Sequence, residues 1–532
     1  MRVLTASQAR AFDRWAIGEA GVPGLLLMEN ASRAVVEEVV RLRSESRPGG
    51  LDRIEILCGP GNNGGDGVAV ARLLAAEGIS NRCHLVAPPR EGSDLEAQVS
   101  IARGLGMALH EDAPGEEVIA GADLFIDALF GTGLSRPLQG PLAELVAQLN
   151  RASAPVVAVD LPSGLDADRG VLIGPAVRAE RTVTFPYPKL AHCLFPAAAE
   201  CGRVVVRGLG VPSSGWRPAD DGEGRCVETI EREAVRRQLP ERVAHAHKGT
   251  YGRVLVVAGS RGLEGAAVLA ASSAVAGGAG LVRLLVPAAC RASLQVRPEV
   301  MVAGVGGEDS GHFVPEDLLE VARVAKDQDA VVLGPGLGES LQTQRFVSGL
   351  IEECEGALIL DADALRVFGP KGGPERVGSA PPILTPHPGE MARMFERPVE
   401  TIVADPIASA REAAERWRAV VVLKGRPTVV AAPEGEVWIN PTGGPLLASG
   451  GSGDVLAGLV GALAAANADA ASAARCGVFV HGLGADRLTA RRSRVGLGAA
   501  AISAELPEAL EACYREAELD GIRVDPEPQG VA

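Results

Sequence analysis

The chain has 532 residues, which is too long for one hydrophobic core and predicts two or three domains. Its formal net charge is −15, which argues against a nucleic-acid or anionic-membrane surface, because such surfaces require positive contacts. Residues 1–17 carry charges and no long apolar run, so we expect no signal peptide. Nine cysteines without a C-x-x-C pair fit reduced thiols, and we expect a cytoplasmic protein without nucleic-acid or membrane partners.

Short apolar runs separated by alanine- and leucine-rich stretches recur along the chain. Such runs suit parallel strands buried on both faces, with helices between them. The pattern therefore predicts the α/β class, with doubly wound sheets. The runs predicted as strands are 54–57, 124–126, 156–159, 254–257, 331–333, 358–360 and 420–423.

The longest apolar stretches, 266–282 and 455–466, consist mostly of alanine and glycine. A membrane span needs about 20 strongly apolar residues, so we expect buried helices packed against a sheet instead.

A change in composition near residues 211–247 predicts the domain boundary. Proline, serine, glycine and aspartate follow Val211, which is loop chemistry, and a new strand is predicted after Gly252. We expect a first domain at 1–212, a linker at 213–246, a second domain at 247–520 and a disordered tail at 521–532.

A glycine-rich loop, 59–67, joins the predicted strand 54–58 to a predicted helix at 68–77. A strand, a glycine turn and a helix N-terminus together form an anion site. Gly59, Gly61 and Gly64 match G-x-G-x-x-G. A dinucleotide fingerprint also needs an acidic residue at the end of the next strand, which this sequence lacks there, and this argues against a standard NAD redox site.

Asp127 and Asp160 each stand at the end of a predicted strand, beside a glycine turn. Ligands bind at the carboxyl ends of strands in open parallel sheets, although a lone aspartate there is often only a helix cap. Two such carboxylates with an asparagine-rich loop, and no lysine near them in sequence, favour a cation and acid–base site.

The motifs Gly-Pro-Gly-Asn-Asn-Gly-Gly-Asp-Gly, Asp-Ala-Leu-Phe-Gly-Thr-Gly and Val-Asp-Leu-Pro-Ser-Gly-Leu-Asp-Ala-Asp resemble the NAD(P)H-hydrate epimerase family over residues 1–210. The resemblance implies that Asp160 is the acid–base residue, that Lys189 supports it, and that a potassium ion is held by Asn63, Asp127 and Ser163. The substrate contacts that it implies, besides Asp160, are Asn62, Asn63, Gly64, Gly65, Asp66, Gly131, Thr132, Gly133, Leu134, Ser135, Arg136 and Pro137.

In the second half, the sequence Gly450-Gly-Ser-Gly-Asp454 precedes the predicted helix 455–466. Backbone N–H groups and the helix dipole at such a place form an anion hole for phosphoryl oxygens, and Asp454 can reach a substrate hydroxyl. This arrangement suits phosphoryl transfer to an alcohol. The simpler alternative is a helix N-cap. No G-x-x-x-x-G-K-[ST] motif is present, so we exclude a P-loop protein.

His387 stands between Pro386 and Pro388, after a short predicted strand at 383–384. A structural and a catalytic role are both compatible with this rigid loop. No second histidine stands at metal-ligand spacing, which argues against zinc.

Lys-Gly-Thr-Tyr-Gly, Leu-Thr-Pro-His-Pro-Gly-Glu, Leu-Lys-Gly-x-x-Thr and Gly-Gly-Ser-Gly-Asp resemble the ribokinase-like superfamily, and specifically its ADP-dependent NAD(P)H-hydrate dehydratases, over residues 245–510. The resemblance implies a Rossmann-like N-terminal domain followed by a ribokinase-like α/β/α domain, with Mg²⁺ and ADP. Asp454 is then the base on the substrate hydroxyl, and Ala266, Gly336 and His387 touch the hydrated nicotinamide. The implied contacts to the adenine nucleotide are Lys424, Gly425, Arg426, Pro427, Thr428 and Gly453.

Lysine is rare in this chain: residues 189, 248, 326, 371 and 424 are lysine, and the other basic residues are arginine. A retained lysine is therefore expected where a compact ammonium is needed, with random survival as the alternative. Lys189, Lys248 and Lys424 all fall inside motifs.

The leading hypothesis is a fused enzyme that repairs hydrated NADH and NADPH, and we expect a homo-oligomer. Two alternatives stay open at this point. The first is a vitamin or sugar-alcohol kinase with an N-terminal nucleotide-binding regulatory module, and the second is a nucleotide-binding scaffold without turnover.

Overall fold

The computed structural model describes residues 1–45, 51–212, 215–216, 226–374, 380–466 and 468–515. These residues form two compact units, Arg2–Cys226 and the chain from Val227 onward, and each unit has its own sheet. The predicted tail, 521–532, lies outside the described residues.

The N-terminal unit is built on a seven-stranded sheet in which all neighbouring strands are parallel. The strands in spatial order are β4 (Leu109–His110), β3 (Asn81–Leu85), β2 (Ile54–Cys58), β5 (Leu124–Ala128), β6 (Val156–Val159), β7 (Arg181–Thr184) and β8 (Arg203–Val206). Strand β2 lies between β3 and β5, so the chain reverses its direction of winding between β2 and β5.

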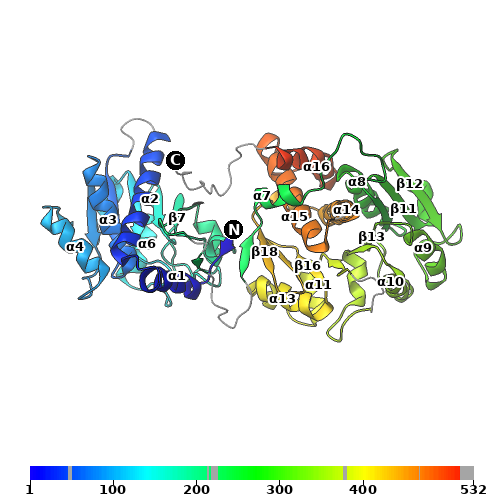
Figure 1. Cartoon of the computed structure of the whole chain (residues 1–532), viewed down its shortest axis with the longest axis horizontal. Coiled ribbons are helices and arrows are strands. Elements are labelled where there is room, and N and C mark those ends of the chain that lie inside the picture. The colour runs from blue at the N-terminus through cyan, green and yellow to red at the C-terminus, as the bar shows by residue number, and fades with distance from the viewer. Residues whose placement is uncertain (46–50, 213–214, 217–225, 375–379, 467, 516–532) are drawn as a thin grey trace. The chain divides into compact units, whose positions relative to one another are not determined.

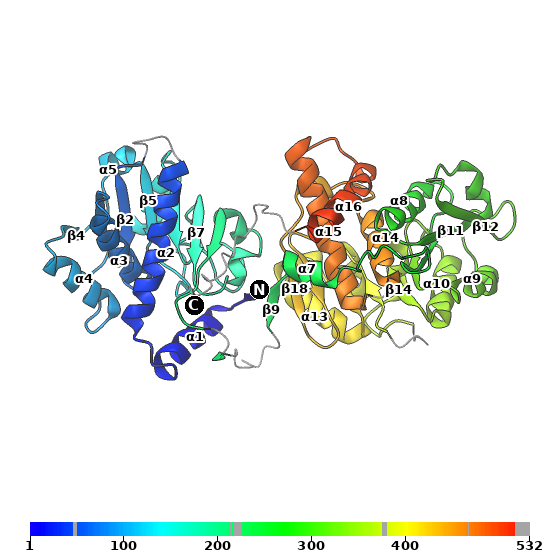
Figure 2. The ribbon, with the colours of Figure 1, turned by 45° about the horizontal axis from the view of Figure 1, so that its top comes forward.

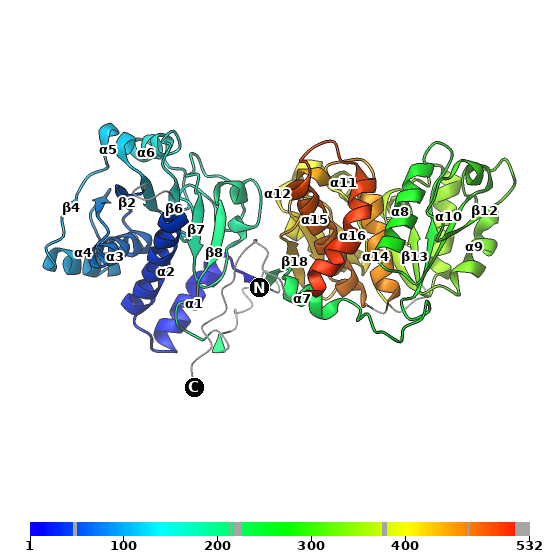
Figure 3. The same ribbon diagram turned by 90° about the horizontal axis from the view of Figure 1, so that it is seen from above.

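Helices cover both faces of this sheet, as Figure 3 shows. Alternate residues of β5 enter different cores: Leu124 and Ile126 pack with α2, α3 and α4, whereas Phe125 packs with α5 and α6. This is a doubly wound α/β unit. Its helices are α1 (Ala6–Gly18), α2 (Gly24–Glu45), α3 (Asn62–Ala76), α4 (Asp94–Gly104), α5 (Glu116–Gly121) and α6 (Pro141–Leu149).

The C-terminal unit has a mixed sheet. Its central strands are parallel, and β17 is antiparallel to both of its neighbours. The winding direction reverses between β10 and β13. The strands in spatial order are β9 (Val227–Thr229), β18 (Val437–Asn440), β17 (Thr428–Ala431), β16 (Val420–Leu423), β15 (Ile383–Leu384), β14 (Ala357–Leu360), β13 (Ala330–Leu333), β10 (Arg253–Val257), β11 (Leu281–Pro287) and β12 (Val300–Val305).

Two helical layers flank the C-terminal sheet, which gives the α/β/α arrangement visible in Figure 1. One layer contains α8 (Glu264–Ala276), α14 (Ser452–Ala465), α15 (Ala470–Arg491) and α16 (Ala499–Tyr514), beside the short α7 (Arg232–Gln238). The other contains α9 (Leu318–Ala325), α10 (Leu341–Glu353), α11 (Pro388–Phe395), α12 (Val399–Ala404) and α13 (Pro406–Trp417).

Helices α8 and α14 lie side by side at very short range (Figure 2). A Cβ at Gly458 would lie 2.0 Å from the Ala270 carbonyl oxygen, so the glycine permits the contact. All residues of α14 from Val455 to Ala465 are buried. Small residues therefore hold α14 against both α8 and the sheet, and this fixes the position of its N-terminus.

Every run predicted as a strand lies within a strand, and the α/β class is confirmed in both units. Two details differ from expectation. The apolar stretch 266–282 is not one helix, because α8 ends at Ala276 and β11 begins at Leu281 after Gly278 adopts a positive φ of 88°. The stretch 213–246, expected to be a linker, contains β9 and α7, and both pack in the C-terminal unit because Ile230, Val235 and Leu239 enter its core.

Among the described residues, no helix is long and apolar enough to cross a membrane.

Candidate active sites

The glycine-rich loop lies flat against the end of β5. The N–H of Gly59 donates to the carbonyl of Ala128 (3.0 Å), and a Cβ at Gly59 would lie 1.8 Å from the Leu129 carbonyl oxygen. Helix α3 begins at Asn62, six residues earlier than predicted. The predicted substrate residues 62–66 therefore form the first turn of α3, at the point between β2 and β5 where the winding reverses and α/β sheets bind ligands.

Asp127 and Ser163 meet in the sheet interior. The Ser163 backbone N–H donates to Asp127 Oδ2 (2.8 Å) and its hydroxyl donates to Asp127 Oδ1 (2.7 Å), while the N–H of Leu129 also reaches Oδ1 (3.2 Å). Both side chains are fully buried. Burial raises the pKa of Asp127, and these hydrogen bonds offset only part of that rise.

Gly131 brings Asn63 and Asp160 together. A Cβ at Gly131 would lie 3.3 Å from Asn63 Oδ1 and 3.4 Å from Asp160 Oδ2, so a side chain there would crowd both groups. Asn63 Nδ2 is buried and has no hydrogen-bond partner within the described chain. Two of the residues expected to act together, one after β2 and one after β6, thus lie at the same place.

Asp160 is held by a buried lysine from a distant segment. Lys189 Nζ donates to Asp160 Oδ1, to the Thr184 hydroxyl (2.9 Å) and to the Phe185 carbonyl (2.7 Å). Thr184 also donates to Asp160 Oδ1 (2.9 Å), and Asp160 adopts a positive φ of 64°. Burial alone raises the pKa of Asp160, but the charge and hydrogen bond of Lys189 outweigh it, and the pKa is lowered.

His192, which sequence reasoning missed, completes this arrangement. The backbone N–H of Lys189 donates to its Nδ1 (2.8 Å), so Nε2 carries the proton and donates to the Asp160 carbonyl (2.9 Å). Burial lowers the pKa of His192 to about 4. His192 is therefore neutral and ties the backbone of the aspartate to the lysine loop.

The other predicted contacts of this unit form a less enclosed rim. Ser135, Arg136 and Pro137 are exposed, as is Gly133, whereas Thr132 and Leu134 are half-buried. Burial, followed by the negative charges of Asp160 and Asp13, raises the pKa of Asp66 well above its ordinary value. The rim is thus open to solvent beside a buried acidic interior.

In the C-terminal unit, Asp454 lies in the first turn of α14, as expected. Gly451 precedes the helix with a positive φ of 88°. Burial, followed by the charge of Asp361, raises the pKa of Asp454 to about 7, and the opposite effect of Lys424 is smaller. A carboxylate with this pKa can accept a proton near neutral pH.

Lys424 reaches the same helix N-terminus from the end of β16. Its Nζ donates to Asp361 Oδ1 (2.8 Å) and lies 3.7 Å from Glu390 Oε2. A Cβ at Gly453 would lie 3.2 Å from this Nζ, so the lysine sits against the glycine turn. The sequence gives no role to Asp361, and only its contact with Lys424 places it at this site.

His387 caps helix α11. Its Nδ1 accepts from the N–H groups of Gly389 (3.0 Å) and Glu390 (3.2 Å), and the Glu390 side chain accepts from the His387 N–H (2.7 Å). Nε2 therefore carries the proton. The histidine side chain is 56% exposed, so its outer edge is open to a ligand while its inner edge has a structural role.

Ala266 and Gly336 are neighbours, as a common substrate site requires. Gly336 has a positive φ of 62°, and a Cβ there would lie 3.1 Å from the Ala266 Cβ. In the predicted nucleotide loop, Gly425 and Arg426 are exposed, and the Thr428 hydroxyl donates to the Gly425 carbonyl (3.2 Å). Lys248 is also exposed. The other two lysines in motifs form ion pairs inside their units, Lys189 with Asp160 and Lys424 with Asp361.

No group of three or more His, Cys, Asp or Glu side chains in the described part of the chain is arranged to hold a metal ion.

Comparison with known proteins assigns both halves. Residues 24–191 match the model of the YjeF-related protein N-terminus, and residues 254–508 match that of NAD(P)H-hydrate dehydratase. A solved structure of the ADP/ATP-dependent NAD(P)H-hydrate dehydratase from Bacillus subtilis, co-crystallised with ATP and Mg²⁺, is 34% identical. The similarity covers 54% of this chain and 99% of that one, with a TM-score of 0.48.

Two curated relatives match this chain over almost its whole length. The bifunctional NAD(P)H-hydrate repair enzyme Nnr of Moorella thermoacetica is 37% identical over 97% of this chain and 98% of its own length. The protein of the same name from Thermofilum pendens is 38% identical with the same coverage. The resemblance found in the motifs is thereby confirmed, and the chain belongs to the family of bifunctional NAD(P)H-hydrate repair enzymes.

Proposed function

We propose that the N-terminal unit interconverts the R and S epimers of hydrated NADH and NADPH, and that the C-terminal unit dehydrates the S epimer at the expense of ADP. The observation that carries this proposal is that each unit has a partly buried aspartate near a lysine ammonium, Asp160 with Lys189 and Asp454 with Lys424. The proposed domains are 1–212 and 247–520, and β9 and α7 add the preceding segment to the second.

In the proposed epimerase site, Asp160 Oδ2 exchanges a proton with the substrate. The hydrogen bonds from Lys189 and Thr184 engage Oδ1, and Oδ2 lies beside Gly131 and Asn63. The lowered pKa keeps the carboxylate ionised at neutral pH. The first turn of α3 and the loop from Gly131 to Pro137 would bind the substrate on either side of this oxygen.

Asn63, Asp127 and Ser163 would hold the potassium ion. The oxygen-rich donor set suits a hard cation, and the fully buried Asp127 carboxylate accepts hydrogen bonds from Ser163 and Leu129, which bring no positive charge. The Nδ2 atom of Asn63 makes no hydrogen bond within the described chain, so this amide is free to turn its oxygen toward the ion. When bound, the ion supplies positive charge beside the buried carboxylate.

In the proposed dehydratase site, Asp454 takes the proton of the substrate hydroxyl, and the hydroxyl oxygen attacks the terminal phosphate of the nucleotide. The N–H groups of the glycine turn and the ammonium of Lys424 face the transferred phosphoryl group. Phosphate then leaves with the C–O bonding electrons while a proton leaves the adjacent ring carbon, which restores the ring double bond. Phosphate is a much better leaving group than hydroxide, which accounts for kinase-like chemistry in a dehydratase.

Ala266, Gly336 and the exposed edge of His387 would contact the hydrated nicotinamide, and Lys424 to Thr428 with Gly453 would contact the adenine nucleotide. Mg²⁺ would enter on the nucleotide phosphates, since it retains water and phosphate ligands in such sites. A homo-oligomer and a cytoplasmic location stay predictions. Light scattering would test the first, and Leu26, whose side chain is 50% exposed on α2, is an apolar group available for assembly.

The test is recovery of the NADH absorbance band. Mixed epimers of hydrated NADH are incubated with the protein, K⁺, Mg²⁺ and ADP. Complete recovery is expected, and recovery that stops at the fraction of one epimer would show an active C-terminal unit alone. No recovery with ADP or ATP would contradict the proposal and favour a kinase acting on another alcohol.

A further inference from the structure

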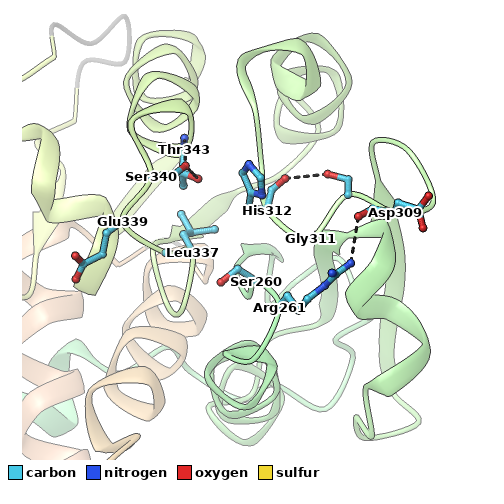
Figure 4. A pocket seen from close by; sticks show the side chains of 11 residues that line it. Ser260, Arg261, Asp309, Gly311, His312, Leu337, Glu339, Ser340 and Thr343 are labelled. Carbon is cyan, nitrogen blue, oxygen red and sulfur yellow. Dashed lines mark hydrogen bonds between the residues drawn. The ribbon is translucent and has the colours of Figure 1, made fainter.

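A cavity of about 420 Å³ opens beside the proposed dehydratase site (Figure 4). Its walls are three loops at the carboxyl ends of strands: Ser260 and Arg261 after β10, residues 309–312 after β12, and residues 337–340 after β13, with Thr343 from α10. It therefore lies over the point between β10 and β13 where the winding reverses, the usual ligand crevice of an open α/β sheet.

This cavity is continuous with the proposed substrate site. The Ser260 hydroxyl donates to the Gly336 carbonyl (2.9 Å), and Gly336 is in contact range of Ala266. The predicted nucleotide loop, Lys424 to Thr428, follows β16, on the other side of β14 and Asp361. Along the sheet, the predicted nucleotide loop thus lies on one side of Asp454, and the cavity lies on the other side.

The chemistry of the lining suits a phosphate-bearing ligand. Arg261 is exposed, and its Nη2 donates to the Asp309 carbonyl (3.3 Å), which orients the guanidinium along the wall. In Figure 4 the His312 ring points into the cavity, whereas the carboxylates of Asp309 and Glu339 point away from it. Glu339 is also paired with Arg366. The Arg261 guanidinium and the His312 ring therefore line the ligand space with nitrogen atoms, whereas the two carboxylates point out of it.

We propose that this cavity binds the adenylate arm of the hydrated dinucleotide, with Arg261 on the adenylate phosphate. The inference rests on the proposed function, which puts the nicotinamide end at Ala266 and Gly336. The volume falls within the range of about 300–1,000 Å³ typical of small-molecule pockets and far exceeds the needs of a single phosphate. Arg261 then sets affinity for the dinucleotide and takes no part in the chemical step.

The test compares two substrates that differ only in this arm. Hydrated NADH contains the adenylate arm, whereas hydrated reduced nicotinamide mononucleotide lacks the adenylate and keeps only the phosphate next to the nicotinamide riboside. Kinetics are measured with the full chain for the wild type, Arg261→Ala, Arg261→Lys and the matched control Arg323→Ala, which removes an exposed arginine from α9.

For Arg261→Ala, we expect the KM for hydrated NADH to rise about five- to tenfold, the range for loss of a partly exposed charged hydrogen bond, with kcat and the KM for ADP unchanged. Arg261→Lys should recover part of this loss. The mononucleotide hydrate should be converted equally by all four proteins.

An unchanged KM for hydrated NADH would overturn the inference, as would an equal rise for both hydrates or a rise in the KM for ADP. Failure of the wild type to convert either hydrate would instead contradict the proposed function, so the two failures are distinguishable.

Discussion

Asp160 and Asp454 make an instructive pair, because similar surroundings move their pKa values in opposite directions. Both are largely enclosed by protein, and both have a lysine ammonium nearby, which is buried for Lys189 and partly buried for Lys424. Lys189 donates directly to Asp160, and the pKa of Asp160 is lowered. Lys424 donates to Asp361 instead, and burial with that extra negative charge raises the pKa of Asp454 to about 7. The pKa of each aspartate therefore depends on which carboxylate the ammonium contacts, and an ammonium that is only nearby does not lower it below its ordinary value.

The largest expected effect comes from removing each carboxylate. Asp454→Asn should lower dehydration by about 10²- to 10⁴-fold, the range for loss of a general base, and leave epimerisation intact. Asp160→Asn should do the reverse. Dehydration is followed by NADH absorbance and epimerisation by chromatographic separation of the two hydrates. A folded variant that lost both activities would show that the two sites are not independent.

Removal of Lys189, which donates directly to Asp160, should give Asp160 a raised pKa like that of Asp454. In Lys189→Met the burial of Asp160 is no longer offset, so its pKa should rise and its ionised fraction at neutral pH should fall. We expect epimerisation at pH 7 to drop on the order of tenfold or more and to recover partly at pH 9. The unfolding free energy should also fall by about 3–5 kcal/mol.

Lys326→Met, at the exposed end of α9, is the matched control for loss of a lysine. A pH-independent loss of epimerisation in Lys189→Met would mean that Lys189 acts otherwise than through the ionisation of Asp160.

The wild-type enzyme should show the same contrast in its pH profiles. Because a base must be deprotonated, dehydration should rise about tenfold between pH 6 and pH 8 as Asp454 ionises through a pKa of about 7. Epimerisation should change less than about twofold, since the pKa of Asp160 lies below 3.8. Initial rates of both reactions in one buffer series check this, and a flat dehydration profile would contradict it.

The smallest expected effect is a shift of that dehydration profile. Asp361→Asn removes the negative charge that contributes most, after burial, to the raised pKa of Asp454. Its midpoint should move to lower pH by about half a unit to one unit, which raises the relative rate at pH 6 by a few fold. Epimerisation serves as the internal control. A midpoint that stayed in place would show that burial alone sets the pKa of Asp454.

Much of the fold could be predicted because it depends on local pattern. Short apolar runs gave the central strands of both sheets, and glycine turns at their ends located Asp127, Asp160 and Asp454 correctly at strand ends or a helix start. Helix limits were less accurate. The glycines of 59–67 suggested a loop, but the sequence from Asn62 is helical because Gly64 and Gly67 allow α3 to approach β2 and β5 closely.

No lysine lies near the N-terminal carboxylates in the sequence, and only the resemblance to the epimerase family suggested that Lys189 supports Asp160. Lys189 is 29 residues from Asp160 along the chain, yet its ammonium is hydrogen-bonded to that carboxylate. The link between Lys424 and Asp361 spans 63 residues. No local signal could have paired these groups.

The sequence by itself determined the fold class, the family and the residues that can carry the chemistry, because motifs and apolar periodicity are local properties of the chain. Only the tertiary structure decided which oxygen each lysine contacts, that His387 caps a helix while its outer edge stays open, and that a cavity adjoins Gly336. These outcomes depend on burial and on contacts between strand ends that are distant in sequence, and the charge state of each aspartate follows from them.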